Sequence, residues 1–294
     1  MSMLKNIIIS MRPAQWTKNL LVFAGPFFGR GLSGLPAFVF ISEVFAVFCL
    51  VSSGSYIIND VIDREKDKFH PDKKKRPIAS GKLSVRSAFF ASLVLILTGI
   101  IWAGCLSMDF FLLIMFFILL HILYDIFLKH IPIIDVMVIA CAFILRLFGG
   151  VIARPIGISL SSWILLCTFL LALFLALCKR RAEVAVLSDD SGRHRKSIAD
   201  YNIDFLNQLI TITGSCAILS YSIYALSPDT IAKRGTDKLV YTIPFVVYGI
   251  FRYLYLVHIK SGGSNPENLL LKDMPLLIDI ILYGLIVYLV IYTH

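Results

Sequence analysis

Charged side chains are scarce in this chain of 294 residues: Asp, Glu, Lys and Arg make up 16% of it, against about 25% in soluble domains. Cysteine is also sparse. The six cysteines lie singly in apolar stretches with no Cys-x-x-Cys spacing, which excludes a disulfide scaffold and favours buried, unbonded thiols. Hydrophobic residues instead reach 58%, and the mean hydropathy is +0.82. This composition excludes a disordered or secreted soluble protein and indicates a polytopic membrane protein.

Long apolar runs recur along the whole chain. A helix needs about 20 mostly apolar residues to cross a bilayer. Eight runs of this kind occupy approximately residues 37–58, 87–106, 110–128, 131–153, 158–178, 205–226, 239–257 and 275–293. A ninth is predicted at about 14–29, where Lys18 interrupts the first half. Because the runs are continuous rather than alternating, they predict helices and not a β-barrel. The predicted fold is all-α: a single polytopic membrane bundle of about nine transmembrane helices over residues 1–294, with cytoplasmic loops at about 59–86 and 179–204.

Lysine and arginine are distributed unequally between the two sides of this predicted bundle. With the N-terminus in the cytoplasm, 21 of the 28 Lys and Arg residues fall on the cytoplasmic side and two lie within spans. The five on the outer side are Arg30, Arg154, Lys233, Arg234 and Lys238. This bias follows the positive-inside rule, so we expect a multi-pass protein of the cell inner membrane whose charged loops face the cytoplasm. The excess positive charge belongs to loops at the lipid surface, and no nucleic-acid partner is expected.

A cluster of acidic residues directly follows the run at 37–58. On a continuous helix at about 100° per residue, Asp60, Asp63 and Asp67 fall within about 60° of one another, with Asn59 beside them. Carboxylates so close together repel one another and need a positive partner. One reading is a solvated helix end that neighbouring lysines neutralise. The sharper reading is a divalent metal, because carboxylate and amide oxygens suit Mg²⁺. All four residues are therefore candidate metal ligands.

Basic residues follow the acidic cluster in the same predicted loop. Lys75 and Arg76 lie there, and Mg²⁺ commonly shares its coordination shell with substrate phosphates. Arginine is suited to bidentate contact with phosphate. Carboxylates and basic side chains together favour a site for Mg²⁺-diphosphate.

The pattern Asn59-Asp60-x-x-Asp63-x-x-x-Asp67, followed by Lys75-Arg76-Pro77-Ile78-x-x-Gly81, resembles the first aspartate-rich motif of the UbiA superfamily of intramembrane prenyltransferases. The resemblance implies a bundle of about nine spans in which this motif binds Mg²⁺-diphosphate. The family's second motif resembles the stretch from Tyr124-Asp125-x-x-x-Lys129 to Asp135.

Three further stretches resemble one branch of that family, the decaprenyl-phosphate phosphoribosyltransferases. They are Arg12-Pro13-x-Gln15-Trp16-x-Lys18-Asn19, then Asp135-Val136 with Phe143-x-Leu145-Arg146, and Lys179-Arg180-Arg181-x-Glu183 with His194-Arg195 and Tyr201. This resemblance implies transfer of 5-phosphoribose from phosphoribosyl diphosphate to a polyprenyl (decaprenyl-like) phosphate, with Mg²⁺ as cofactor and diphosphate as the leaving group. Two anionic substrates would also use the second basic cluster at 179–181.

The matching motifs imply roles for individual residues. Those expected to act in catalysis are Asp63, Asp67 and Asp135. Those expected to bind substrate are Lys18, Asn19, Lys75, Arg76, Tyr124, Lys129, Arg146, Lys179, Arg180, Glu183, Arg195 and Tyr201. Asp135 and Arg146 fall within about 20° on one helix face, and both are expected to point into the bundle because ionisable groups that face lipid are costly. The phosphate acceptor is ionised near neutral pH, so no general base is needed.

Two other functions are left open by these residues. Within the family, the alternative is transfer of a polyprenyl group from its diphosphate to an aromatic acceptor, because the aspartates alone do not choose between the two donors. Outside it, the alternative is a transporter or lipid-binding protein. Transporters often place ionisable groups near the midplane in repeated halves, whereas here the acids gather at one surface and the sequence shows no internal repeat. The expected partners are the membrane, phosphoribosyl diphosphate and polyprenyl phosphate, with a homo-oligomer expected from the resemblance alone.

Overall fold

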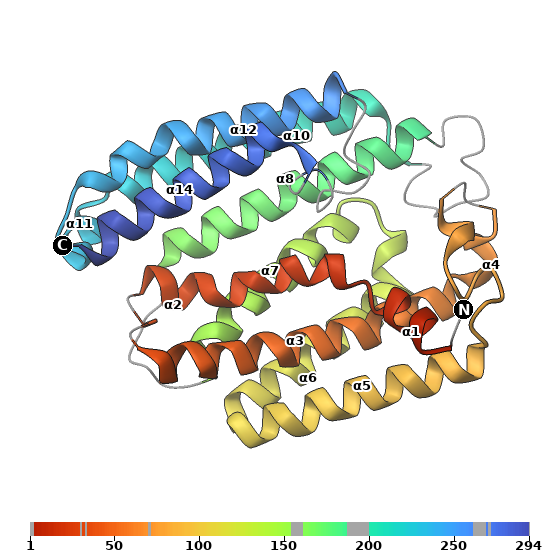
Figure 1. Cartoon of the computed structure of the whole chain (residues 1–294). Helices are drawn as coiled ribbons and strands as arrows, with labels where there is room; N and C mark the ends of the chain where they lie inside the picture. Colours follow the sequence, from red (N-terminus) through yellow and green to blue (C-terminus); the bar gives the residue numbers. More distant parts are fainter. Residues whose placement is uncertain are drawn as a thin grey trace. The chain divides into compact units, whose positions relative to one another are not determined.

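The computed structural model describes residues 3–29, 31–32, 34–69, 72–153, 161–186, 200–260, 269 and 272–293 (Figure 1). Within these residues the regular secondary structure is helical, without strands. Eight helical segments are long and apolar enough to cross a membrane. They are α3 (Leu35–Ile62), α5 (Val85–Leu106), α6 (Met108–Ile126), α7 (Ile134–Ile152), α8 (Ser162–Val186), α10 (Ile203–Leu226), α12 (Ile243–His258) with the preceding η5 (Lys238–Thr242), and α14 (Met274–Tyr292). The predicted polytopic helical fold is confirmed, and the eight continuous runs each lie on one of these segments.

The ninth predicted span has a different local structure. Residues 14–29 lie mostly in a 3₁₀ helix, η1 (Pro13–Phe23), and a short α2 (Ala24–Phe28). A 3₁₀ helix rises about 2.0 Å per residue and an α-helix about 1.5 Å, so the two together extend roughly 30 Å, about the thickness of the hydrocarbon core. The described chain therefore has eight long apolar helices, together with one apolar segment that is mostly 3₁₀.

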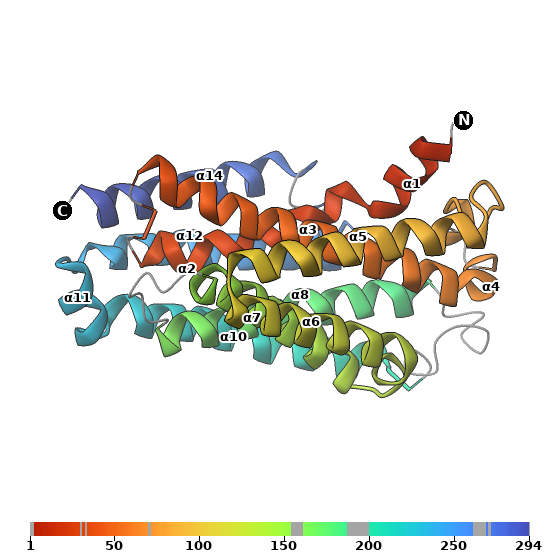
Figure 2. The ribbon, with the colours of Figure 1, turned by 90° about the horizontal axis from the view of Figure 1, so that it is seen from below.

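The chain divides into two compact units. Unit 1 comprises Met1–Val138, Leu145–Ser159 and Gly192–Ser197, and unit 2 comprises Ile139–Ile144, Leu160–Ser191 and Ile198–His294. The long helix α3 organises unit 1, because α5, η1, α1 (Met3–Met11) and α6 all contact it. Figures 1 and 2 both show α3 and α5 side by side.

Small residues allow α3 and α5 to approach closely. The Ser92 hydroxyl donates to the Gly54 carbonyl oxygen at 2.9 Å. A Cβ atom on Gly54 would lie 2.5 Å from Cγ1 of Ile96, and one on Gly99 would lie 2.6 Å from Cγ2 of Val51. Hydrophobic side chains gain little from leaving lipid, so this tight backbone contact and its interhelical hydrogen bond hold α3 in place.

Two adjacent glycines set α7 against the first half of unit 1. A Cβ atom on Gly149 would lie 2.4 Å from Cε2 of Phe48, whose ring packs edge-on against Phe110 and Phe117. A Cβ atom on Gly150 would lie 1.9 Å from the Val22 carbonyl oxygen of η1. Only glycine fits at both positions, and the contact sets the C-terminal end of α7 against η1.

The N-terminal helix α1 has its apolar side outward. Leu4 and Ile8 are exposed, whereas Asn6 and Ser10 are buried. The Asn6 side-chain amide donates to the Lys82 carbonyl oxygen at 3.0 Å. An outward apolar side on a short helix suits a position in the membrane interface, and the polar side attaches the helix to the rest of unit 1.

Unit 2 is built on α10, which packs against α8 and α12, while α14 packs against α12. The Arg181 side chain joins three of these helices, since Nε donates to Oδ1 of Asn207 at 2.7 Å and Nη1 donates to the Val257 carbonyl oxygen at 3.2 Å. Arg252 makes a two-pronged ion pair with Asp273 at 3.0 and 2.9 Å, which lowers the pKa of that carboxyl below its usual range. Asp273 also caps the N-terminus of α14.

We predict that Gly150→Ala destabilises the protein, because the new methyl group meets backbone rather than a movable side chain. Overpacking of this kind costs about 1–3 kcal/mol or more, and we expect a clear fall in the thermal unfolding midpoint of the detergent-solubilised protein. Gly284→Ala in α14 is the matched control, since nothing lies within 4 Å of its added Cβ. Equal midpoints for the two variants would contradict the packing of α7 on η1.

Candidate functional site

The acidic cluster lies where α3 ends in unit 1. α3 stops at Ile62, Asp63 caps it with φ −87° and ψ 3°, and the short α4 (Arg64–Asp67) follows. The prediction of one continuous helix through Asp67 is wrong at Asp63, where the helix is interrupted. The break is short: the Asp63 amide still donates to the Asn59 carbonyl oxygen at 2.9 Å, and the Asp67 amide donates to that of Asp63 at 2.8 Å.

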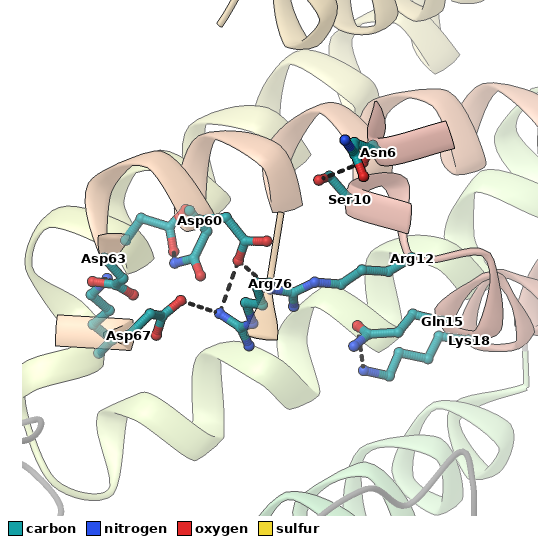
Figure 3. A network of polar contacts seen from close by, with 12 residues as sticks. Asn6, Ser10, Arg12, Gln15, Lys18, Asp60, Asp63, Asp67 and Arg76 are labelled. Carbon is teal, nitrogen blue, oxygen red and sulfur yellow. Dashed lines mark hydrogen bonds and ion pairs between the residues drawn. The ribbon is translucent and has the colours of Figure 1, made fainter. Parts of the chain in front are cut away.

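All three aspartate side chains are buried, and they point in two directions. Asp60 and Asp67 turn toward the same guanidinium group: Nη1 of Arg76 lies 2.9 Å from Oδ1 of Asp60 and 2.6 Å from Oδ2 of Asp67 (Figure 3). Asp63 turns away from them toward Lys129. One basic residue of the predicted phosphate-binding loop thus bridges two predicted metal ligands.

Arg12 is a second cation on Asp60. Its Nη2 atom forms an ion pair and hydrogen bond with Oδ1 of Asp60, and its guanidinium group lies 5.4 Å from the centre of the Tyr56 ring. Figure 3 shows the Arg12 side chain reaching the carboxylate from the side of α1. The Arg12 backbone has a left-handed conformation, φ 54°, which is uncommon for a residue other than glycine. Such conformations concentrate at functional sites.

Lys129 is the third cation, and it is almost completely buried, with 1% of its surface exposed. It lies in η3 (Leu128–His130), and its Nζ atom is 2.9 Å from each carboxylate oxygen of Asp63. A buried lysine needs such a partner to remain charged. The first and second predicted motifs, more than sixty residues apart in sequence, are therefore joined by an ion pair.

A hydrogen bond joins the same two motifs a second time. The Asn59 side-chain amide donates to Oδ1 of Asp125, which is buried near the end of α6. Tyr124, its neighbour in sequence, is half-buried. Asn59 thus orients its amide nitrogen toward an acid, which leaves the oxygen as the atom suited to a metal ion.

The donor atoms of this cluster fit magnesium chemically. Among the described residues, no three His, Cys, Asp or Glu side chains stand close enough to hold a metal ion by themselves. Mg²⁺ rarely uses such a cage: it keeps several waters and binds through one or two carboxylates together with substrate phosphates. The buried carboxylates of Asp60, Asp63 and Asp67 provide hard oxygen atoms of that kind, and in this structure basic side chains neutralise them.

Farther along unit 1, a buried polar chain involves three helices. Nε of Arg146 in α7 donates to Oδ1 of Asn19 in η1 at 2.7 Å, and the Arg146 guanidinium lies 4.8 Å from the centre of the Phe117 ring. The Asn19 amide donates to Sγ of Cys49 in α3 at 3.3 Å. Asp135, at the other end of α7, is also fully buried. The prediction that Asp135 and Arg146 both point inward is confirmed.

Strain marks the approach to Asp135. Ile133, which precedes α7, has φ 68°, and a β-branched residue at positive φ is a genuine outlier. Among the described non-glycine residues, only Arg12 and Ile133 have positive φ. Arg12 forms an ion pair with Asp60 of the acidic cluster, and Ile133 lies two residues before Asp135 of the second motif.

Two predicted binding residues lie at the edge of the cluster. Lys75 is exposed, and its Nζ atom is 3.9 Å from Oδ1 of the equally exposed Asp72. Nζ of Lys18 is 3.3 Å from Oε1 of Gln15. Arg76, rather than Lys75, is the residue of this loop that reaches the buried carboxylates.

Four of the remaining predicted residues, Lys179, Arg180, Glu183 and Tyr201, belong to unit 2. Nη1 of Arg180 forms an ion pair with Oε2 of Glu183, one turn farther along α8, and the arginine is buried. Lys179 is half-buried and Tyr201 is buried. Arg195 lies outside the described residues.

Arg12 and Asp125 are cluster residues to which sequence reasoning gave no role. Both stand in the stretches that carry the family resemblance. Their partners, Asp60 and Asn59, are 48 and 66 residues away, and helical periodicity gives no signal for a contact across such a distance. The sequence did indicate that the acids need positive partners, because burying an unpaired carboxylate is costly, but it did not indicate which residues those partners are.

Comparisons with known proteins identify the family of the chain. The sequence profile described as the UbiA prenyltransferase family matches residues 20–274. The decaprenyl-phosphate phosphoribosyltransferase of Mycolicibacterium smegmatis is 31% identical over 281 residues, 92% of this chain and 88% of that protein. The protein of the same name from Corynebacterium glutamicum is 31% identical over 276 residues, 91% of this chain and 81% of that protein.

A solved structure agrees in fold. The structure of a UbiA homolog from Archaeoglobus fulgidus bound to GPP and Mg²⁺ superimposes with a TM-score of 0.72 over 97% of this chain and 99% of that chain, at 19% identity. The chain belongs to the UbiA prenyltransferase family and is a multi-pass membrane transferase.

We predict that Lys129→Met lowers the thermal unfolding midpoint strongly, because it leaves the Asp63 carboxylate buried without this cation. Breaking a buried ion pair costs about 3–5 kcal/mol. The double variant Asp63→Asn/Lys129→Met should recover most of the loss, since both groups are then neutral. Lys75→Met is the control, because its ion pair is exposed. An unchanged midpoint in Lys129→Met would show that the buried pair does not contribute to stability.

Proposed function

We propose that this UbiA-family transferase moves 5-phosphoribose from phosphoribosyl diphosphate to a polyprenyl phosphate and releases diphosphate. The observation that carries the proposal is the buried array in which Arg12, Arg76 and Lys129 neutralise Asp60, Asp63 and Asp67. Relatives named decaprenyl-phosphate phosphoribosyltransferase, similar over about nine-tenths of the chain, support this choice of donor and acceptor.

The reaction exchanges one bond at the anomeric carbon of ribose. The bond between C1 and the bridging diphosphate oxygen breaks, and its electron pair leaves with the diphosphate. An oxygen of the lipid phosphate forms the new bond to C1, which is oxocarbenium-like in between. That oxygen is already ionised near neutral pH, so the protein needs to stabilise the leaving group rather than remove a proton.

The buried array is suited to a leaving diphosphate because it contains separate sets of negative and positive side chains. Asn59, Asp60, Asp63 and Asp67 would hold Mg²⁺, which supplies charge neutralisation to the departing diphosphate when it is bound. The carboxylates now neutralised by Arg12, Arg76 and Lys129 would then have a second positive partner. Those three basic side chains could turn to the phosphate oxygens without leaving a buried charge uncompensated.

Further residues are assigned to the phosphates and hydroxyls of the two substrates. In unit 1 these are Lys18, Asn19, Lys75, Tyr124 and Arg146, with Asp135 acting near the reacting carbon. In unit 2 they are Lys179, Arg180, Glu183 and Tyr201. Arg195 is a further candidate. The excess of Lys and Arg in the loops that carry these residues supports an active site on the cytoplasmic face of the inner membrane.

We predict that purified protein forms a polyprenyl-linked phosphoribose from labelled phosphoribosyl diphosphate and a polyprenyl phosphate. EDTA should stop product formation and Mg²⁺ should restore it. The matched assay uses a polyprenyl diphosphate with 4-hydroxybenzoate as acceptor. Product in the second assay but not in the first would reject phosphoribosyl transfer in favour of prenyl transfer, and diphosphate release without either product would reject both.

We predict that Asp67→Asn lowers turnover at least about 100-fold, because the amide keeps the size of the side chain but removes a charged ligand. The protein should remain folded and inserted in the membrane. Arg76, which loses the charge of Asp67, still has Asp60 as an ion-pair partner. Asp72→Asn is the control: it lies in the same loop, but 82% of its side chain is exposed. Near-normal turnover of Asp67→Asn with saturating Mg²⁺ would remove Asp67 from the metal site.

A further inference from the structure

A second polar pocket lies in unit 2, at the end of the unit away from Arg180. It has a volume of about 150 Å³ and lies between the start of α8, the end of α10 and the short α11 (Pro228–Arg234). Eighteen residues of α8 separate Ser162 from Arg180, which is about 27 Å along the helix. The pocket is therefore at the other end of the membrane-spanning segment from the predicted cytoplasmic cluster.

The pocket combines two basic side chains, hydroxyl groups and one acid. Its lining consists of Ser161, Ser162, Trp163, Tyr224, Asp229, Thr230, Lys233 and Arg234. Lysine and arginine provide charge-assisted hydrogen bonds to a phosphate group, and serine and threonine hydroxyls can donate to its remaining oxygens. A carboxylate in the same pocket disfavours a simple anion and favours a ligand that carries a positive group as well.

The presence of Lys233 and Arg234 in this pocket is unusual for the predicted outer face. On the predicted outer face Lys and Arg are rare, and two of the five such residues line this one pocket. Basic residues in the last turn of α11 also suit the dipole of that helix. That effect does not require both side chains to share a pocket with hydroxyl groups.

The surface beside the pocket is suited to acyl chains. Leu219, Ile223 and Leu226 are exposed and follow the i, i+4, i+7 spacing of one helix face, on the last two turns of α10. Trp163 in the pocket lining is an aromatic residue of the kind enriched at the membrane interface. A phosphate at the pocket with hydrocarbon on this helix face describes a phospholipid rather than a free phosphate ion.

We infer that this pocket binds the head group of an amine-bearing phospholipid from the leaflet opposite the active site, with the phosphate on Lys233 and Arg234 and the ammonium group on Asp229. The inference does not depend on the reaction that the protein catalyses. It assigns unit 2 a specific lipid contact that would hold the α8–α10–α11 end of the unit at the membrane surface.

The test titrates detergent-solubilised protein with dioleoyl phosphatidylethanolamine, dioleoyl phosphatidylcholine and inorganic phosphate, and counts bound molecules by native mass spectrometry. We expect phosphatidylethanolamine to bind about tenfold more tightly than phosphatidylcholine, whose quaternary ammonium cannot donate a hydrogen bond to Asp229. Asp229→Asn should remove that preference. Lys233→Ala/Arg234→Ala should weaken both lipids about tenfold.

Two further variants keep the test decisive. Lys238→Ala removes a basic residue at the start of η5, four residues after Arg234, that does not line the pocket, and this variant should bind lipid as the unaltered protein does. Ser162→Phe fills the pocket without changing its charge and should lower the binding of both lipids. This variant serves as the test if the double alanine variant fails to fold. Equal binding of the two lipids, displacement of lipid by inorganic phosphate, or an equal loss in Lys238→Ala would each overturn the inference.

Discussion

Buried carboxylates without positive partners would be too costly for this protein, and the arrangement of unit 1 follows from that constraint. Asp60, Asp63 and Asp67 are all buried at the end of α3. Each has a basic partner, and the three partners come from three separate segments: the residue after α1, the loop that contains η2 (Lys73–Lys75), and η3. The acids therefore gather distant parts of the chain around one helix end.

Close contacts between helices hold the rest of the same framework. Gly54 and Gly99 bring α3 and α5 together, and Gly149 with Gly150 brings α7 against α3 and η1. These contacts depend on close packing and on the hydrogen bond from Ser92 to Gly54, whereas ion pairs hold the acidic cluster together. Rigid packing along the helices leaves the polar end as the part that can change partners, which is what a site for a charged substrate requires.

The sequence was sufficient to predict the positions of the long helices but not the contacts that their polar side chains make. Apolar runs of about 20 residues predicted all eight long helices because the bilayer imposes a length and a composition on every span. The same rule failed to show that residues 13–23 are 3₁₀ and that α3 breaks at Asp63, since both depend on local backbone geometry. Motif spacing identified most of the polar cluster. It could not show that Arg12 reaches Asp60 or that Lys75 stays outside, because those outcomes depend on tertiary contacts.

One guanidinium nitrogen of Arg76 pairs with both Asp60 and Asp67, but these two carboxylates differ in their number of cationic partners. Asp60 is held by Arg76 and also by Arg12, whereas Arg76 is the ion-pair partner of Asp67 in the part of the chain that the structure describes. If the Arg76 side chain moves away, Asp67 loses this ion pair, whereas Asp60 keeps its ion pair with Arg12. Of these two carboxylates, Asp67 would therefore become available to an arriving ligand first, while Asp60 keeps a cationic partner.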